Sequence, residues 1–271
     1  MVAIYLLALA ALLAALLSLH RASTTRDWKP DFARQAYGEI DGDTLTLHDL
    51  RTTRYPEPGE PYEVRWDTRS YDLSELKRLW FLVESFSKLE VVAHTFLSFE
   101  FADGTCLAVS VEARPEVGEN YDILDGVLRR FELSYIFGDE RDMILRRTRY
   151  QQHQVYMYPL VTPPEEVRAV LLRMVETAND LKVKPRFYNS ITDNCTSVLR
   201  KHANEVRPGS FGMFALAQVL PGTSDKMLYK KGWLATEVTL GALRERYAIK
   251  EKSEICAKKA EFSSCLRAEL S

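Results

Sequence analysis

An unbroken apolar run at the start of the chain constrains the fold more than any other feature of the sequence. Residues 2–19 carry no charge, and nearly all of them are Leu, Ala, Val or Ile. As an α-helix this run would be about 27 Å long, close to the roughly 30 Å hydrocarbon thickness of a bilayer. Because no polar face interrupts the run, we expect a membrane segment rather than a helix in a globular core.

Residues 1–20 have two interpretations, an uncleaved membrane anchor or a signal peptide. A signal peptide needs a basic start and a small-x-small cleavage site. Here only the α-amino group precedes the run, and the sequence from Ser18 to Ser23 makes a poor cleavage site, which favours the anchor. Arg21, Arg26 and Lys29 follow the run, and the positive-inside rule taken alone would place them in the cytoplasm.

Composition restricts the rest of the chain to an ordinary folded domain. Among the 271 residues, 36 Lys and Arg face 38 Asp and Glu, so the formal charge is −2. Nucleic-acid-binding proteins have a basic excess, so we expect no nucleic-acid partner. Four cysteines without a Cys-x-x-Cys pair exclude a disulfide scaffold and most zinc-ribbon folds. We expect a polar linker over residues 21–35 and one α/β (α+β) domain over residues 36–271.

Alternation of apolar and polar residues predicts several strands. Residues 39–50 indicate a turn followed by a strand, and residues 155–160 indicate another strand. Residues 91–101 and 106–113 predict a hairpin around Asp103-Gly104. One register that brings the apolar residues of both strands to one face of the sheet pairs Leu97 with Val111, Phe99 with Val109, and Phe101 with Leu107.

This register has a chemical consequence on the other face of the hairpin. It leaves Asp103, Gly104 and Thr105 in the loop and puts His94 opposite Arg114. His94 and Glu112 become diagonal neighbours, about 7 Å apart at Cβ. A carboxylate within reach of an imidazole can fix its tautomer and orientation. The alternative for Glu112 is an ion pair with Arg114 or a nearby lysine at the surface.

Three segments carry signals for the start of a helix. Asp72 and Glu75 form a capping box ahead of apolar residues at helical spacing. Thr162 opens a second helix with a first-turn proline, and its apolar stripe is expected in the core: Val167, Val170, Leu171, Met174, Val175 and Ala178. A third helix begins at Asn194 or Cys195, and the polar tail after about residue 240 is helical in propensity.

Cys195 and His94 are the candidate nucleophile and base. Asn194 is a favoured helix cap, so Cys195 would lie in the first turn, where the macrodipole and free N–H groups favour a thiolate. The Cys195 N–H can also help to bind an oxyanion. His94 begins a strand and can act as the base of a nucleophile pair. Taken alone, each residue also fits a buried structural role.

The remaining histidines and charged clusters carry weaker signals. His20, His48, His153 and His202 form no pair with metal-ligand spacing, and the sequence has no Gly-rich phosphate loop. We therefore expect no metal and no organic cofactor. Residues 138–142 are dense in charge and are interpreted as a solvated turn or as an internal ion-pair network.

Taken together and in order, several segments resemble the Lnb N-terminal periplasmic domain family over roughly residues 27–205. The family is named after a bacterial lipoprotein N-acyltransferase. The resemblance is carried by the segments Asp27-Trp28, Ile40-Asp-Gly-Asp, Tyr71-Asp-Leu, His94-Thr-Phe-Leu-Ser-Phe-Glu-Phe-x-Asp-Gly, Ala108-Val-Ser-Val-Glu-Ala-Arg114, Gly118-Glu119, Gly138-Asp-Glu-Arg-Asp142, Val155-Tyr-Met-Tyr-Pro159 and Phe187-Tyr-Asn-x-x-Thr-x-Asn-Cys-Thr196.

This resemblance implies a thiol acyl-transfer site in a circularly permuted papain-like or NlpC-like fold. Cys195 would be the nucleophile, His94 the base and Glu112 the group that orients it. The Cys195 N–H, with Asn194 or Tyr188, would bind the oxyanion. The expected substrate is an acyl ester of a membrane lipid or lipoprotein. The alternatives are a cell-wall cysteine amidase or peptidase, and an inactive membrane-anchored binding module.

The family also implies that the domain lies outside the cytoplasmic membrane. We accordingly expect a single-pass anchor over residues 2–19 with the domain facing the periplasm, although the transferase that names the family has further spans. In an oxidising compartment Cys256 and Cys265 should pair. One continuous helix would separate them by about 13.5 Å, too far for a disulfide, so we expect a turn near residues 262–264. Two free thiols on a tail helix are the alternative.

Overall fold

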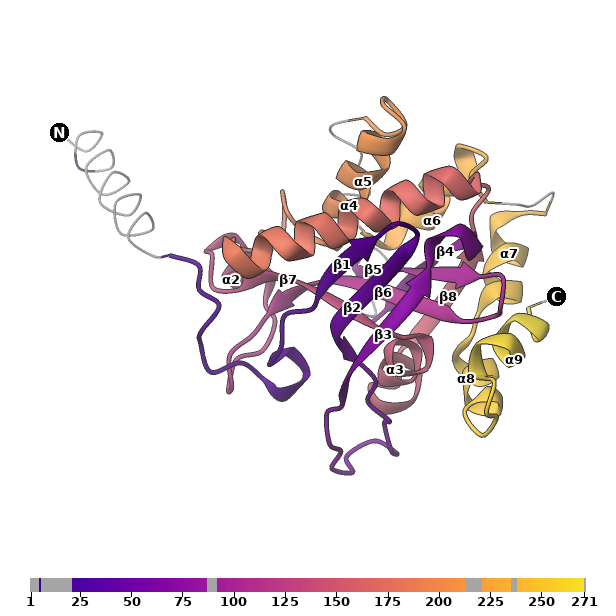
Figure 1. Cartoon of the computed structure of the whole chain (residues 1–271). Coiled ribbons are helices and arrows are strands. Elements are labelled where there is room, and N and C mark those ends of the chain that lie inside the picture. The colour runs from indigo at the N-terminus through magenta and orange to yellow at the C-terminus, as the bar shows by residue number, and fades with distance from the viewer. Residues whose placement is uncertain (1–4, 6–20, 87–91, 213–220, 235–237, 271) are drawn as a thin grey trace.

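The computed structural model describes residues 5, 21–86, 92–212, 221–234 and 238–270 (Figure 1). The apolar run over residues 2–19, for which we expect a membrane anchor, lies outside these residues apart from Tyr5. Within the described ranges, no helix is both long enough and apolar enough to cross a membrane.

One mixed, mostly antiparallel sheet forms the centre of the described molecule. Its eight strands follow the order β1-β2-β7-β6-β5-β4-β8, and β3 pairs with β2 beside this path. The strands are β1 (Tyr37–Asp41), β2 (Thr44–Arg51), β3 (Trp66–Asp72), β4 (Leu76–Ser85), β5 (Ala93–Phe101), β6 (Cys106–Arg114), β7 (Glu132–Asp139) and β8 (Gln154–Pro159). An α/β architecture with an antiparallel sheet and packed helices is therefore present as expected.

Helices pack against this sheet and around its ends. Among the described residues these are α2 (Ile123–Val127), α3 (Glu140–Leu145), α4 (Pro164–Val183), α5 (Cys195–Val206), α6 (Ser224–Lys230), α7 (Leu240–Tyr247), α8 (Lys250–Cys256) and α9 (Phe262–Ala268). The long α4 lies across β1, β4 and β7, α5 packs on β5 and β6, and α3 contacts β6 and β7. Helices α8 and α9 lie at the opposite end of the molecule from α2 (Figure 1).

The central strands β7 and β5 are buried on both faces. Every residue of β7 is buried, and in β5 only His94 is partly accessible. The apolar stripe expected for α4 is buried in full, which confirms that helix as a core element. The helix begins at Pro164 rather than at Thr162, and no side chain caps it.

The predicted register of the β5–β6 hairpin is wrong by two residues. Leu97 pairs with Val109, and Phe99 pairs with Leu107. The loop keeps three residues but begins one residue earlier, at Ala102, because Phe101 N–H donates to the carbonyl oxygen of Thr105 at 3.0 Å. Gly104 in this loop adopts φ +85°, a conformation suited to glycine. A shift of two residues keeps every side chain on its expected face, so His94 and Glu112 still share one.

The helix predicted after Asp72 is also wrong. Asp72 does cap, accepting a hydrogen bond from Ser74 N–H at 2.9 Å, but only a 3-10 turn over Leu73–Glu75 follows, and the chain then enters β4. Residues 79–83 are all buried in β4. A strand that is buried on both faces does not alternate between apolar and polar residues. The apolar residues of β4 therefore also matched the spacing of an amphipathic helix.

The segment expected to be a linker packs on the domain. Trp28 is buried, forms a β-bridge with Glu116 and lies under the Arg114 guanidinium, 4.2 Å from the ring centroid. Phe32 belongs to the hydrophobic core. Residues 28–32 are therefore part of the folded domain rather than a spacer.

The C-terminal tail folds into short helices, as expected. A disulfide joins Cys256 at the end of α8 to Cys265 in α9, with a Cα–Cα distance of 5.7 Å. The chain turns over residues 257–261, a little before the predicted position, and Phe262 already begins α9. Cys106 and Cys195 are free and buried.

Candidate active site

The thiol of Cys195 lies at the first residue of α5. The Asn194 side chain accepts a hydrogen bond from Ser197 N–H at 2.9 Å, and Ser197 Oγ accepts one from Asn194 N–H at 2.8 Å. This reciprocal capping box fixes the N-terminus of α5. Cys195 therefore has the helical position that the sequence predicts, with 4% of its surface exposed.

His94 lies beside this helix start, at the beginning of β5. The alternation of a strand directs Thr95 to α5, where its Oγ1 lies 3.0 Å from Oγ1 of Thr196. His94 points to the other face, and its Nε2 lies 2.6 Å from Ser110 Oγ and 3.3 Å from Glu112 Oε1. Because Nε2 meets these two groups, Nδ1 is the nitrogen available to the Cys195 thiol.

Ser110 and Glu112 hold the imidazole in place. Ser110 Oγ donates a hydrogen bond to Glu112 Oε1 at 2.6 Å, so its lone pair is free to accept from the Nε2–H of His94. This arrangement keeps the Nε2 proton in place and leaves Nδ1 as the basic nitrogen. Glu112 thus lies in contact with His94, and Ser110 is an additional contact that the sequence alone did not reveal.

The electrostatics favour a charged cysteine–histidine pair. Burial alone disfavours the imidazolium, but the charges of Glu112 and Cys195 outweigh it and raise the pKa of His94 to about 10. Burial likewise disfavours the thiolate, yet the charge of His94 and its hydrogen bond lower the pKa of Cys195 below its ordinary value. The pKa of Glu112 is lowered too, against burial, chiefly by His94 and then by Arg147.

Arg147 connects Glu112 to a second carboxylate behind the site. Its guanidinium donates to Glu112 Oε1 at 2.8 Å and to Glu84 Oε2 at 2.8 Å. His153 Nδ1 lies 2.6 Å from the other oxygen of Glu84. The polar chain therefore runs from the thiol through His94, Glu112, Arg147 and Glu84. Sequence reasoning did not identify Arg147 or Glu84, although Glu84 is the register partner of His94 across β4 and β5.

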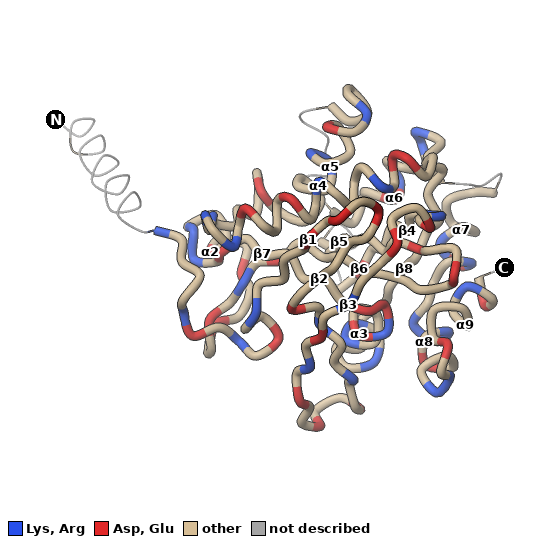
Figure 2. The backbone as a smooth tube through the Cα atoms, in the orientation of Figure 1, with Lys and Arg blue, Asp and Glu red and all other residues tan. Residues whose placement is uncertain are grey.

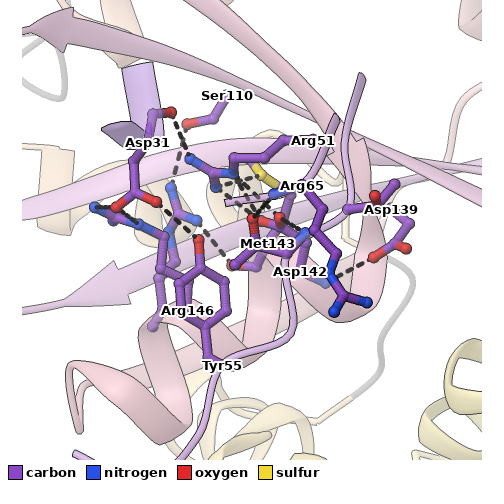
Figure 3. Close-up of polar contacts among 12 residues, drawn as sticks. Asp31, Arg51, Tyr55, Arg65, Ser110, Asp139, Asp142, Met143 and Arg146 are labelled. Carbon is purple, nitrogen blue, oxygen red and sulfur yellow. Dashed lines mark hydrogen bonds and ion pairs between the residues drawn. The ribbon is translucent and has the colours of Figure 1, made fainter. Parts of the chain in front are cut away.

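A second buried network lies next to this chain (Figure 3). Arg51 on β2 donates to both oxygens of Asp142, which also accepts from Thr53 N–H at 2.7 Å. Arg146 Nη2 lies 3.3 Å from Asp31 Oδ2, and Arg147 follows directly in the chain. Of the two interpretations of residues 138–142, the internal ion-pair network is therefore the correct one.

The two side chains expected to bind the oxyanion, Asn194 and Tyr188, differ in their hydrogen-bond partners. Both polar atoms of the Asn194 side-chain amide have partners in the fold: its oxygen caps α5, and its nitrogen donates to the Ser190 carbonyl at 2.8 Å. Its role as a helix cap is present and uses the amide oxygen, whereas an oxyanion contact would need a hydrogen of the amide nitrogen. Tyr188 is buried, and burial followed by the nearby charge of Cys195 raises its pKa well above the ordinary value, so its hydroxyl stays a proton donor.

A cavity of about 410 Å³ gives access to the thiol. Its polar side includes His94, Glu112 and Arg147, and its apolar side includes Phe86 and Ile191. Tyr121 and Ile123 line the cavity on the side of α2, and both are about half exposed. The cavity therefore combines a nucleophile with a wall suited to an apolar substrate group.

The other candidate residues lie away from this cavity or have structural partners. His202 is buried and its Nε2 lies 2.7 Å from Tyr135 Oη. Cys106 is a buried strand thiol whose pKa is raised by burial. Within the described ranges, no group of three or more His, Cys, Asp or Glu side chains is arranged to hold a metal ion.

Comparison with known proteins identifies the family of the chain. Residues 62–220, more than half of the sequence, match the model of the Lnb N-terminal periplasmic domain. The matched range includes His94, Glu112, Arg147 and Cys195. No curated protein and no solved structure matches the chain.

Proposed function

Because the chain belongs to the Lnb N-terminal periplasmic domain family, we propose that it is a thiol-dependent acyltransferase or hydrolase. Its substrate is an acyl ester of a membrane lipid or lipoprotein. The observation that carries the proposal is the contact of Cys195 at a helix start with His94, whose far nitrogen is held by Ser110 and Glu112. A thiol, a base and an orienting carboxylate are the parts that nucleophilic catalysis requires.

The reaction has two steps. The Cys195 thiolate attacks the ester carbonyl, and the electron pair of the carbonyl moves to its oxygen, where the Cys195 N–H at the free end of α5 can stabilise it. Collapse of this intermediate forms the acyl thioester and expels the alcohol, which takes its proton from His94. In the second step His94 accepts a proton from an amine or water, which attacks the thioester and regenerates the thiol.

The neighbouring charges suit this cycle. Glu112 stabilises the imidazolium that is present before the alcohol leaves, and Arg147 keeps Glu112 ionised and fixed in direction. In the Glu112–Arg147 pair the Arg147 side chain is almost fully buried, and the Glu112 side chain is about four-fifths buried. An ion pair formed before substrate binds requires little reorganisation during the reaction.

The proposal also includes a fold relationship and a location. A strand histidine that precedes a helix-start cysteine in the chain is the order of a circularly permuted papain-like or NlpC-like fold. The family description names a periplasmic domain, so we place the domain on the outer side of the cytoplasmic membrane. Residues 2–19 would then be its single-pass anchor.

Mass spectrometry of the full chain tests the proposal. The protein is incubated with a bacterial lipid extract and then digested without reduction. We expect an acyl adduct on the peptide that contains Cys195, removable by hydroxylamine as a thioester is, and none on Cys106. The Cys195→Ser variant is the matched control for specificity.

Other outcomes have distinct meanings. Absence of any adduct, together with turnover of cell-wall peptides, would replace the lipid substrate by a peptide substrate while keeping the thiol mechanism. Absence of both activities in folded protein would contradict the proposal and leave the domain as a binding module.

A further inference from the structure

The mouth of the active-site cavity has an apolar rim that faces solvent. The rim consists of Tyr121, Ile123, Leu124, Leu128 and Ile191. Leu124 is 71% exposed, and the other four are about half exposed. Scattered exposed apolar residues are ordinary, but a contiguous group beside a cavity marks an interaction surface.

The rim is one surface although it comes from two parts of the chain. Ser190 Oγ donates to the Ile123 carbonyl at 2.9 Å and lies 3.3 Å from Tyr121 Oη. These contacts tie the α2 segment to the loop that carries Ile191, four residues before Cys195, where α5 begins. Three of the rim residues, Tyr121, Ile123 and Ile191, also line the cavity that contains the thiol.

Basic side chains border the rim on its outer side. Arg21, Arg129 and Arg186 are exposed and line a neighbouring hollow of about 540 Å³. Blue segments accordingly lie near α2 and at the point where the described chain begins (Figure 2). The acidic residues of α2 are engaged locally, since Asp122 caps the helix and Asp125 lies 3.5 Å from Arg130. Exposed apolar side chains bordered by arginines suit the interface of an anionic bilayer.

The position of Arg21, where the described domain begins, indicates that the partner of this surface is a bilayer. The uncharged sequence of residues 2–19 joins the described domain at Arg21, and Arg21 shares the hollow with Arg129 and Arg186 next to the rim. A membrane segment attached there would hold this side of the domain close to the lipid. The cavity would then open toward the acyl chains rather than toward water.

We propose that the apolar rim docks on the membrane surface and gives lipid acyl chains direct access to Cys195. This inference rests on the proposed function and names the surface through which its substrate arrives. Leu124, Leu128 and Ile123 contact the acyl region, while Arg129 and Arg186 contact the anionic headgroups. Entry beside Tyr121 and Ile191 brings the ester to the thiol.

Tryptophan quenching tests this docking without using catalysis. Leu124→Trp is introduced into the full chain, which is reconstituted in vesicles of phosphatidylethanolamine and phosphatidylglycerol with bromine near the top of the acyl chains. We expect the emission added by the new tryptophan to be about twofold lower than in unbrominated vesicles, because interfacial side chains lie within reach of the bromine. Ile255→Trp is the matched control, since Ile255 is exposed on α8 at the far end of the molecule (Figure 1), and it should keep its emission.

The outcomes separate this inference from the proposed function. Equal quenching at both positions, or none at Leu124→Trp, would overturn docking through the rim. A blue shift without quenching would also overturn it, because a protein surface such as a second copy of the chain would then cover the rim. Repeating the measurement with Cys195→Ser gives the same quenching if docking is correct, whether or not the thiol is catalytic.

Discussion

The chemistry of single residues depends on how they are paired. A lone Cys195 at 4% exposure would be an inert buried thiol with a raised pKa, as Cys106 is. Contact with His94 reverses the direction and lowers the pKa of Cys195. The difference between the two buried cysteines is therefore electrostatic: at Cys106 burial and the charge of Glu140 outweigh the charge of Arg267, whereas at Cys195 the charge of His94 outweighs burial.

The first prediction concerns the nucleophile. Cys195→Ser should abolish turnover, and His94→Ala should reduce it to a similar degree, because the two residues act as a unit. Cys106→Ser is the control and should retain the activity of the wild type, since Cys106 lies outside the cavity. Near-normal turnover of Cys195→Ser, measured with the lipid substrate, would show that the thiol mechanism is wrong.

The second prediction concerns pH. The pKa of His94 rises from 6.5 to about 10 on folding, so the stability that its charge provides is complete below about pH 6.5 and is lost as the pH rises toward 10. The lowered pKa of Cys195 acts in the opposite direction, so the contribution of His94 is measured in the Cys195→Ser background. There the free energy of unfolding should fall over this window, and it should fall less when His94→Gln is added, as measured by urea denaturation. In Glu112→Gln the largest favourable charge is removed, and this pH dependence should weaken; an unchanged dependence would contradict the role of Glu112.

At the scale of elements, α5 and the two central strands hold the site together. The capping box at Asn194 determines where α5 begins and hence where the thiol lies. The hairpin of β5 and β6 determines the distance from His94 to Glu112. The face of each side chain follows from strand alternation, whereas the distance depends on a register that differs by two residues from the one we predicted.

The third prediction concerns this helix start. Asn194→Ala removes both the cap and the hydrogen bond to Ser190, and it should lower the free energy of unfolding by about 1–2 kcal/mol and reduce turnover. Thr239→Ala removes the cap of α7, where the Thr239 hydroxyl accepts from Ala242 N–H at 3.3 Å. It should cost stability without a comparable loss of activity. Equal losses of activity in both variants would mean that the Asn194 cap has no special effect on the site.

At the scale of the whole molecule, distant parts of the sequence close the fold around the site. Asp31 in the N-terminal segment pairs with Arg146, next to Arg147. Arg267 in α9 pairs with Glu140 of α3 and with Glu100 of β5. Both ends of the described chain thus pair with buried charges, and the Asp31–Arg146 pair also lines the cavity.

The fourth prediction follows from the N-terminal segment. A chain that begins at Arg21 should fold and remain in solution, because it keeps Trp28, Asp31 and Phe32. A chain that begins at Ala36 loses two buried aromatic side chains, worth several kcal/mol by area (about 1.5–3 each), and leaves Arg146 without its carboxylate. Circular dichroism and thermal melting should show a folded first chain and a strongly destabilised second one. Equal melting temperatures would mean that residues 21–35 are a spacer after all.

The sequence alone was sufficient for those features that depend on near neighbours. Cap chemistry placed Cys195 at a helix start, alternation put His94 and Glu112 on one face, and the spacing of Cys256 and Cys265 required a turn. Local signals were insufficient where burial on both faces removes periodicity, as in β4, and where chain register depends on turn geometry. Only the tertiary structure revealed Ser110, Arg147 and Glu84 as contacts of the site. These residues come from separate strands and from the end of a helix, and they meet only in the folded interior. A local sequence pattern does not predict which buried charges will pair across such distances in the chain.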